Sequence, residues 1–124
     1  MPKLKSYDTD SFSFSIGKNT LKFANVRGQK TYIKNRMDRL LTKEPETIKW
    51  INQFEKDSVF FDVGANIGIY TLYSAVMKQN TVYSFEPHSA SYKNLLDSIN
   101  LNHLDNCHAF CLALSDKITL SSIN

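Results

Sequence analysis

The sequence contains no apolar stretch close to the roughly 20 residues that a membrane-spanning helix needs. Residues 1–6 have no apolar core behind their charges, so we expect no secretory signal peptide. Cysteine is scarce, and Cys107 and Cys111 are too few for a disulfide framework. These absences predict a cytoplasmic protein with reduced thiols and no membrane partner.

A large excess of charge of one sign is also missing. The 124 residues include 15 Lys and Arg against 12 Asp and Glu, which gives a formal net charge of +3. Nucleic-acid binders usually carry a denser basic stripe, and no run of like charges is long enough for an interaction tail. We therefore expect no nucleic-acid partner. The length suits about one domain.

Glycine is scarce as well, with 4 in the chain, yet Gly64 and Gly68 fall in a single turn. This turn follows the apolar run 59–63, which predicts a strand of a parallel sheet that is covered on both faces. Gly64 lets the backbone leave the strand at angles that a side chain hinders, and Gly68 lets the next helix start close to the strand or to a ligand. Asn66 tolerates a left-handed backbone with or without a ligand.

From residue 58 the pattern alternates strand, helix, strand, helix, strand. Apolar runs predict strands at 59–63, 81–85 and 107–114, and apolar residues three to four apart predict helices at 67–78 and 89–99. Ser89 is the expected N-cap of the second of these helices, and a further strand is expected to begin at Ile118. This order predicts an α/β fold with a Rossmann-like parallel sheet and helices on its faces.

Before residue 58 the sequence predicts a hairpin and two helices. Polar and apolar residues alternate over 12–16 and 20–26, with turn residues between them. A first helix is expected over 30–43, and a second begins at 44–47 and runs to about Glu55. The expected buried face of the first helix comprises Tyr32, Ile33, Met37, Leu40 and Leu41. We expect 1–43 to form an N-terminal extension and 44–124 to form the main domain.

Two acids stand at the carboxyl ends of the neighbouring predicted strands, where ligands bind in open α/β sheets. Asp62 can accept hydrogen bonds from an ammonium group or from loop amides. Glu86 follows Gly68 by one helix and one strand, which is the spacing of the acid that holds a ribose diol. Pro87 then fixes the backbone as the chain leaves the sheet.

The turn departs from the common nucleotide-binding patterns. A dinucleotide fingerprint that starts at Gly64 requires glycine where Asn66 and Ile69 stand, and the Gly-Lys-Ser/Thr of a phosphate-binding loop is absent. A ligand with a ribose and no pyrophosphate fits better. S-adenosylmethionine is such a ligand, with its ribose on Glu86 and its zwitterionic tail near Asp62 and Gly64.

The same residues carry a family resemblance. The segment Phe61–Leu72, which contains Asp-Val-Gly-Ala-Asn-Ile-Gly, resembles the first motif of FkbM-type class I S-adenosylmethionine-dependent methyltransferases, and Ser84–Pro87 resembles their second motif. The match extends from about 44 to 120. Tyr92, Leu95, Asn100 and Asn102 fit the helix that follows, and Ala113–Asp116 fits the third strand and its turn.

The resemblance implies the first β-α-β-α-β half of a class I methyltransferase fold, with S-adenosylmethionine as cofactor. Asp62, Gly64, Asn66 and Gly68 would line the methionine side, Glu86 would hold the ribose, and His88 and the segment 113–115, which includes Ser115, would lie near the adenine. Ala65 and Pro87 complete this cofactor-binding set. The family is described as O-methyltransferases, so the implied acceptor is a hydroxyl of a small molecule or glycan. It continues with further strands, so the chain is expected to be the cofactor-binding portion of an enzyme, with the catalytic base beyond residue 124.

Two other functions remain open at this point. The chain could be a non-catalytic α/β binding or interaction module, because a half-sheet leaves an edge through which copies can associate. It could also be part of a nucleic-acid methyltransferase, although no groove of basic and aromatic residues is visible.

Several residues have two interpretations. We expect no metal site at His103, Cys107, His108 and Cys111, because their spacing is not that of a zinc site. His88 is expected to be a polar rim residue, with a general base as the alternative. Tyr7, Phe12, Phe14 and Phe23 are expected to form a core under the hairpin, with substrate binding as the alternative. For Lys34, Arg36, Arg39 and Lys43 we expect a solvated helix face, with contact to an anionic substrate as the alternative.

Overall fold

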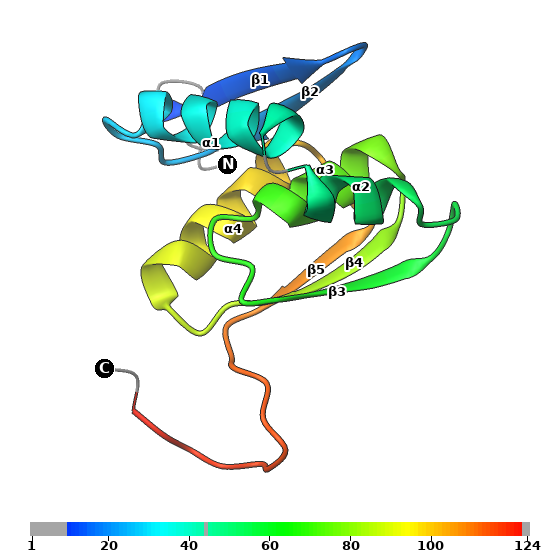
Figure 1. The fold of residues 1–124 in the computed structure, drawn as a ribbon. Helices are drawn as coiled ribbons and strands as arrows, with labels where there is room; N and C mark the ends of the chain where they lie inside the picture. The colour runs from blue at the N-terminus through cyan, green and yellow to red at the C-terminus, as the bar shows by residue number, and fades with distance from the viewer. Residues whose placement is uncertain (1–9, 44, 123–124) are drawn as a thin grey trace, which may run out of the picture.

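The computed structural model describes residues 10–43 and 45–122, and within them the chain forms a hairpin, a three-stranded sheet and four helices (Figure 1). The elements are β1 (Phe12–Ile16), β2 (Asn19–Phe23), α1 (Lys30–Thr42), α2 (Glu46–Asn52), β3 (Val59–Val63), α3 (Ile69–Met77), β4 (Thr81–Phe85), α4 (Ser89–Leu101) and β5 (Cys107–Phe110). None of the described helices has the length and apolar character that crossing a membrane requires. The predicted α/β architecture is confirmed.

The main sheet has the strand order β3-β4-β5, and both pairs of strands are parallel. The register sets Asp62 opposite Ser84 and Val63 opposite Phe85. The carboxyl ends of β3, β4 and β5 therefore meet at one edge, as the strand–helix alternation predicts. The loops that follow these strands begin at that edge.

The prediction that both sheet faces are covered is wrong for the described residues. Both crossover helices, α3 and α4, lie on the same face of the sheet (Figure 1). On β3, Phe60 and Asp62 point toward these helices and are buried, whereas Phe61 on the opposite side is 61% exposed. A continuous apolar run does not distinguish a strand covered twice from one whose second face is open.

The uncovered side of the sheet forms one apolar surface, which we call the open face. Its aromatic rings touch across the strands, with centroid distances of 5.7 Å for Phe61–Tyr83 and 5.5 Å for Phe85–Phe110. The open face comprises Val59, Phe61, Val63, Tyr83, Phe85, His108 and Phe110. Large exposed apolar patches of this kind are typical of interaction surfaces.

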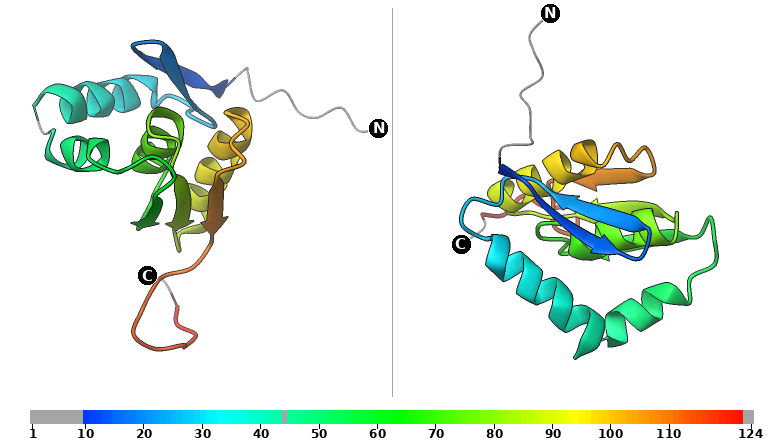
Figure 2. Two further views of the ribbon diagram at one scale, coloured as in Figure 1. Left: turned by 90° about the vertical axis from the view of Figure 1, so that its right-hand side faces the viewer. Right: turned by 90° about the horizontal axis from the view of Figure 1, so that it is seen from above.

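The hairpin packs through β2 on the helices α3 and α4, on the side away from the sheet, and α1 contacts β1 and α2 (Figure 2). Leu21 and Phe23 of β2 lie in one hydrophobic core with Leu72 of α3 and Leu95 of α4. The core interpretation is confirmed for Phe23, and Phe12 and Phe14 pack partly buried against the same core, whereas Tyr7 lies outside the described residues. The division at residue 43 stays a prediction.

The third strand is shorter than its predicted range. It ends at Phe110 instead of residue 114, and the amide of Leu112 donates to the carbonyl oxygen of Phe110 at 3.0 Å, which turns the chain out of the sheet. The strand expected at Ile118 is also wrong, because Ile118 and Leu120 lie fully exposed outside any strand. A strand requires a paired neighbour, and no described strand lies beyond β5.

The ends and exposed faces of the helices differ slightly from those predicted from the sequence. His88, and not Ser89, is the residue that precedes α4 as its cap, and α3 begins at Ile69 because Gly68 is in a left-handed conformation. The helix expected to run to Glu55 ends at Asn52. Leu96 of α4 is exposed.

Candidate functional site

The loop between β3 and α3 makes a tight left-handed turn. The φ angles of Gly64, Asn66 and Gly68 are +73°, +54° and +95°. A Cβ atom on Gly68 would lie 2.5 Å from Leu95 Cδ1, so only glycine allows this close approach of the loop to α4. The geometry thus supports the sequence argument for a close approach at Gly68.

Glu86 ties this loop to the end of β4. Its carboxylate is buried, with an exposed fraction of 8%. Oε1 accepts a hydrogen bond from the Asn66 amide at 2.9 Å, and Oε2 accepts one from the His88 amide at 2.8 Å. The two motif segments that the sequence singles out are therefore joined at the carboxyl edge of the sheet by one side chain.

Asp62 lies on the covered side of β3, between the strand and α3, and is 6% exposed. Its Oδ2 accepts a hydrogen bond from the Thr71 hydroxyl at 2.6 Å, and the Thr71 and Ser84 hydroxyl oxygens are 2.6 Å apart. Burial raises the pKa of Asp62, the hydrogen bonds from Thr71 oppose that rise, and the nearby charge of Glu86 adds to it. Asp62 thus anchors the start of the loop from the interior.

Thr71 and Ser84 were not predicted as site residues. A signal was present, because Thr71 lies inside the first motif and Ser84 inside the second. In the register of the sheet Ser84 is also the partner of Asp62. Two small hydroxyl side chains beside a buried carboxylate are the groups that can hydrogen-bond it without filling the interior.

The other predicted cofactor-binding residues do not all lie near Glu86. His88 is exposed at the rim, and its Nδ1 accepts from the Ser91 amide at 3.4 Å, which makes it a helix cap. Pro87 adjoins Glu86, and the Cys111 thiol lies 3.8 Å from its carbonyl oxygen. Ser115 lies in the exposed segment after β5, where its hydroxyl is 3.3 Å from Asp116 Oδ1. The structure brings Pro87 and His88 to the edge with Glu86 and leaves Ser115 on a separate segment.

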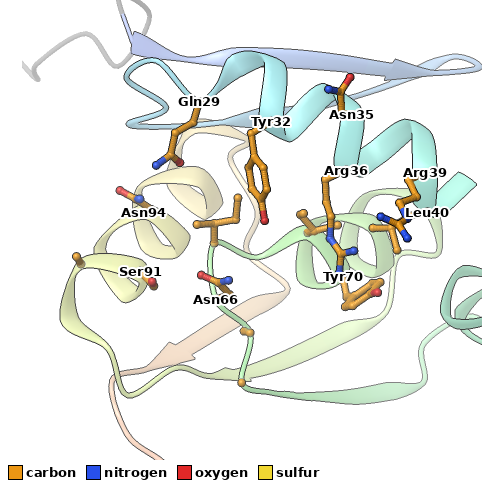
Figure 3. A pocket seen from close by; sticks show the side chains of 15 residues that line it. Gln29, Tyr32, Asn35, Arg36, Arg39, Leu40, Asn66, Tyr70, Ser91 and Asn94 are labelled. Atoms are coloured by element: carbon orange, nitrogen blue, oxygen red, sulfur yellow. The ribbon is translucent and has the colours of Figure 1, made fainter. Parts of the chain in front are cut away.

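A cavity of about 790 Å³ opens beside the loop, between α1 and the first turns of α3 and α4 (Figure 3). Gly64, Ala65 and Asn66 of the predicted set line it, whereas Asp62 and Glu86 do not. The other lining residues that Figure 3 labels are Gln29, Tyr32, Asn35, Arg36, Arg39, Leu40, Tyr70, Ser91 and Asn94. The predicted loop is therefore one wall of a cavity whose opposite wall is α1.

For the basic residues of α1 the sequence predicts a solvated face, with contact to an anionic substrate as the alternative. Tyr32 was expected on the buried face of this helix, but it is 60% exposed and lines the cavity. Tyr32, Arg36 and Arg39 follow one another at four and three residues, so they share one face of the helix. That spacing was a readable signal, but the sequence alone does not show that this face meets the loop.

Of the histidines and cysteines considered for a metal site, Cys107 and His108 lie in β5, whereas His103 and Cys111 lie outside it. Cys107 is buried, and burial raises its pKa to about 12. His108 is exposed on the open face and stacks on Tyr83, with ring centroids 5.0 Å apart. Within the described part of the chain, no group of three or more His, Cys, Asp or Glu side chains could hold a metal ion.

Taken together, the parallel sheet, its glycine turn and the acid at the end of the next strand define a Rossmann-like fold. Solved structures share it. One is a proposed transferase from Pyrococcus horikoshii, with a TM-score of 0.54 and 17% identity over 82% of this chain and 36% of that chain. Another is M. jannaschii TYW2 in complex with AdoMet (S-adenosylmethionine), with a TM-score of 0.53 and 20% identity over 83% of this chain and 43% of that chain.

The chain spans less than half of the length of either structure. At these identities the likeness shows a common fold, and the Rossmann-like prediction is confirmed. No family model matches the chain. No curated protein matches it either.

Proposed function

We propose that this chain binds S-adenosylmethionine and forms the cofactor-binding part of a methyltransferase. The observation that carries the proposal is the pair of backbone hydrogen bonds that the Glu86 carboxylate accepts: the one from Asn66 joins the loop to the end of β4 at the carboxyl edge of the sheet, and the other comes from His88. Ligands of open α/β sheets bind at that edge. The fold is shared with a protein whose structure was solved with AdoMet bound, which supports the choice of ligand.

The residues present fit this cofactor. Each Glu86 oxygen accepts one backbone hydrogen bond. A carboxylate has about four acceptor positions, so both oxygens can accept a further bond from a ribose hydroxyl. The predicted cofactor set remains a proposal. Asp62 and the loop 64–68 would lie on the methionine side and Glu86 on the ribose. His88 and Ser115 would lie toward the adenine, and Pro87 completes the set.

The enzyme family and the class of methyl acceptor are also proposals. The motif resemblance supports an FkbM-type enzyme that methylates a hydroxyl of a sugar or small metabolite. When bound, the cofactor would supply an electrophilic methyl group for transfer from its sulfur to a hydroxyl oxygen, and a base would take the hydroxyl proton. The contribution of this chain is to hold and orient the cofactor. We also propose a cytoplasmic location, since both cysteines are free thiols.

Calorimetric titration of the chain with S-adenosylhomocysteine tests the proposal. Glu86→Ala is expected to weaken binding by about tenfold or more, because hydrogen bonds to a charged acceptor contribute roughly 1.5–3 kcal/mol. Glu55→Ala removes an exposed acid from a different part of the fold and serves as the matched control. It should leave the affinity unchanged.

A second ligand separates recognition of the ribose from damage to the loop. An analogue of S-adenosylhomocysteine without the ribose hydroxyls should bind the wild-type chain more weakly, and Glu86→Ala should no longer distinguish the two ligands. If the chain fails to bind S-adenosylhomocysteine, or if Glu86→Ala retains the same preference for the hydroxyls as the wild type, the proposed function is wrong.

A further inference from the structure

The wall that α1 gives to the cavity is strongly basic. Arg36 and Arg39 extend from this helix toward Tyr70, and Tyr32 extends toward the Asn66 loop (Figure 3). Among the described lining residues none is an acid. The other polar side chains of the lining are uncharged amides and hydroxyls, among them Gln29, Ser91 and Asn94. A cavity of this composition favours a ligand with negative charge.

Not all basic residues of α1 face the cavity. Lys34 lies at another position around the helix, where its Nζ is 2.8 Å from Asp38 Oδ2. Lys34 does not line the cavity, whereas Arg36 does and is half-buried. The basic residues that the sequence predicts as one solvated face therefore separate: Arg36 and Arg39 line the cavity, whereas Lys34 and Lys43 do not.

The opposite wall adds to this preference. It consists of the loop 64–67 and the first turn of α3, where helix amides carry a partial positive charge. The planar guanidinium group can bind phosphate or carboxylate through two parallel hydrogen bonds. Arginines on one wall and a helix start on the other thus form complementary sides for an oxyanion.

We propose that this cavity is the acceptor site and that the acceptor carries a phosphate or carboxylate group held by Arg36 and Arg39. Calling the cavity an acceptor site rests on the proposed function, which places the cofactor at the neighbouring carboxyl edge of the sheet. Glu86, Pro87 and His88 do not line the cavity, so the space lies beside the expected ribose position. The loop 64–66 borders both, which would bring the anionic acceptor next to the methionine side of the cofactor.

Titration of the ¹⁵N-labelled chain with inorganic phosphate, followed by two-dimensional NMR, tests the oxyanion site. The amides of Asn66, Ile67 and Tyr70 should shift in a saturable manner. Arg36→Gln should weaken the binding by about tenfold, and Arg36→Lys should weaken it less because the charge remains. Lys34→Gln is the charge-matched control and should leave the affinity unchanged. Equal effects of Lys34→Gln and Arg36→Gln, or no saturable shift, would overturn the proposal.

Two nucleoside ligands distinguish the acceptor from the cofactor as the source of the oxyanion. S-adenosylhomocysteine has an amino-acid carboxylate, and 5′-methylthioadenosine does not. Equal affinity of wild type and Arg36→Gln for S-adenosylhomocysteine, with phosphate binding weakened, supports an acceptor site. If Arg36→Gln weakens S-adenosylhomocysteine and leaves 5′-methylthioadenosine unchanged, the arginines hold the carboxylate of the cofactor and the acceptor assignment is wrong, whatever the effect on phosphate.

Failure of the proposed function has a separate signature. In that case neither nucleoside binds any of the proteins, while phosphate still binds in an Arg36-dependent way. That result would leave the oxyanion site standing and overturn its assignment to a methyl acceptor.

Discussion

At the scale of single residues, the fold changes the ionisation of Asp62. Burial raises its pKa above 3.8, so the neutral form is favoured in the folded state relative to the unfolded state. Its contribution to folding is therefore fully present below pH 3.8 and is lost as the pH rises through the folded-state pKa. The free energy of unfolding of Asp62→Asn should therefore increase relative to that of the wild type as the pH rises through the folded-state pKa of Asp62. Urea unfolding at a series of pH values measures this difference.

Asp105 supplies the comparison for Asp62, because it is an exposed acid in the loop before β5. The stability difference between Asp105→Asn and the wild type should stay flat over the same pH range. A second variant tests the cause of the shift. Thr71→Val removes a hydrogen bond that lowers the pKa of Asp62, so the carboxyl titration followed by NMR should move to higher pH. A downward movement would contradict the assignment.

Gly68 combines two constraints that a methyl group would break. Its φ of +95° is unfavourable for a side chain, and the added Cβ would lie 2.5 Å from Leu95 Cδ1. We expect Gly68→Ala to lower the free energy of unfolding by about 2–5 kcal/mol, the sum of backbone strain and overpacking. Denaturant unfolding measures the loss.

Gly64→Ala separates these two costs. Gly64 has a φ of +73° in the same loop, but nothing lies within 4 Å of its added Cβ. This variant should lose only about 1–2 kcal/mol, the cost of the left-handed conformation alone. Equal losses at the two positions would mean that the contact with Leu95 relaxes without cost.

At the scale of elements, the hairpin is fixed to α4 by polar contacts as well as by the core. The amide of Ala24 donates to Ser98 Oγ at 2.9 Å, and both residues are buried. Asn102 Oδ1 accepts from the Lys22 amide at 3.0 Å, and its Nδ2 donates to the Lys22 carbonyl at 2.7 Å. These bonds set the orientation of the segment that leads into α1, and α1 forms the basic wall of the cavity.

Ser98→Ala is expected to destabilise the chain by about 1–3 kcal/mol, because it leaves the buried Ala24 amide without an acceptor. Urea unfolding measures the loss, and hydrogen exchange at Ala24 should become faster at the same time. Ser13→Ala, at an exposed position of β1, is the control and should change stability by less than about 0.5 kcal/mol. An unchanged exchange rate at Ala24 would mean that the hairpin does not depend on this bond.

The elements also show which information a sequence carries. Strict alternation predicted β1, and an apolar run ending at a glycine turn predicted β3, because both patterns are local. The length of β5 was overestimated, because a strand ends where its pairing partner ends. The loop and Glu86 were predicted from spacing, whereas the α1 wall depends on how the hairpin docks on α4. Docking is a tertiary event that periodicity does not encode.

At the scale of the whole molecule, the open face is the feature that most affects behaviour in solution. Phe61 is 61% exposed and Val63 is 59% exposed, and no Asp, Glu, Lys or Arg belongs to the open face. The surface is thus apolar without charges that would repel a second copy. We therefore expect the chain to self-associate as its concentration rises, because large exposed apolar patches tend to be buried.

Sedimentation velocity over a range of protein concentrations tests this association. The wild type should shift toward a dimer or larger species as the concentration rises. Phe61→Lys should remain monomeric, because pairing would bury a lysine on an apolar surface without a partner. Ile118→Lys makes the same chemical change at a fully exposed residue outside the open face, so it should associate like the wild type. A wild-type chain that stays monomeric at every concentration would show that the open face does not mediate self-association.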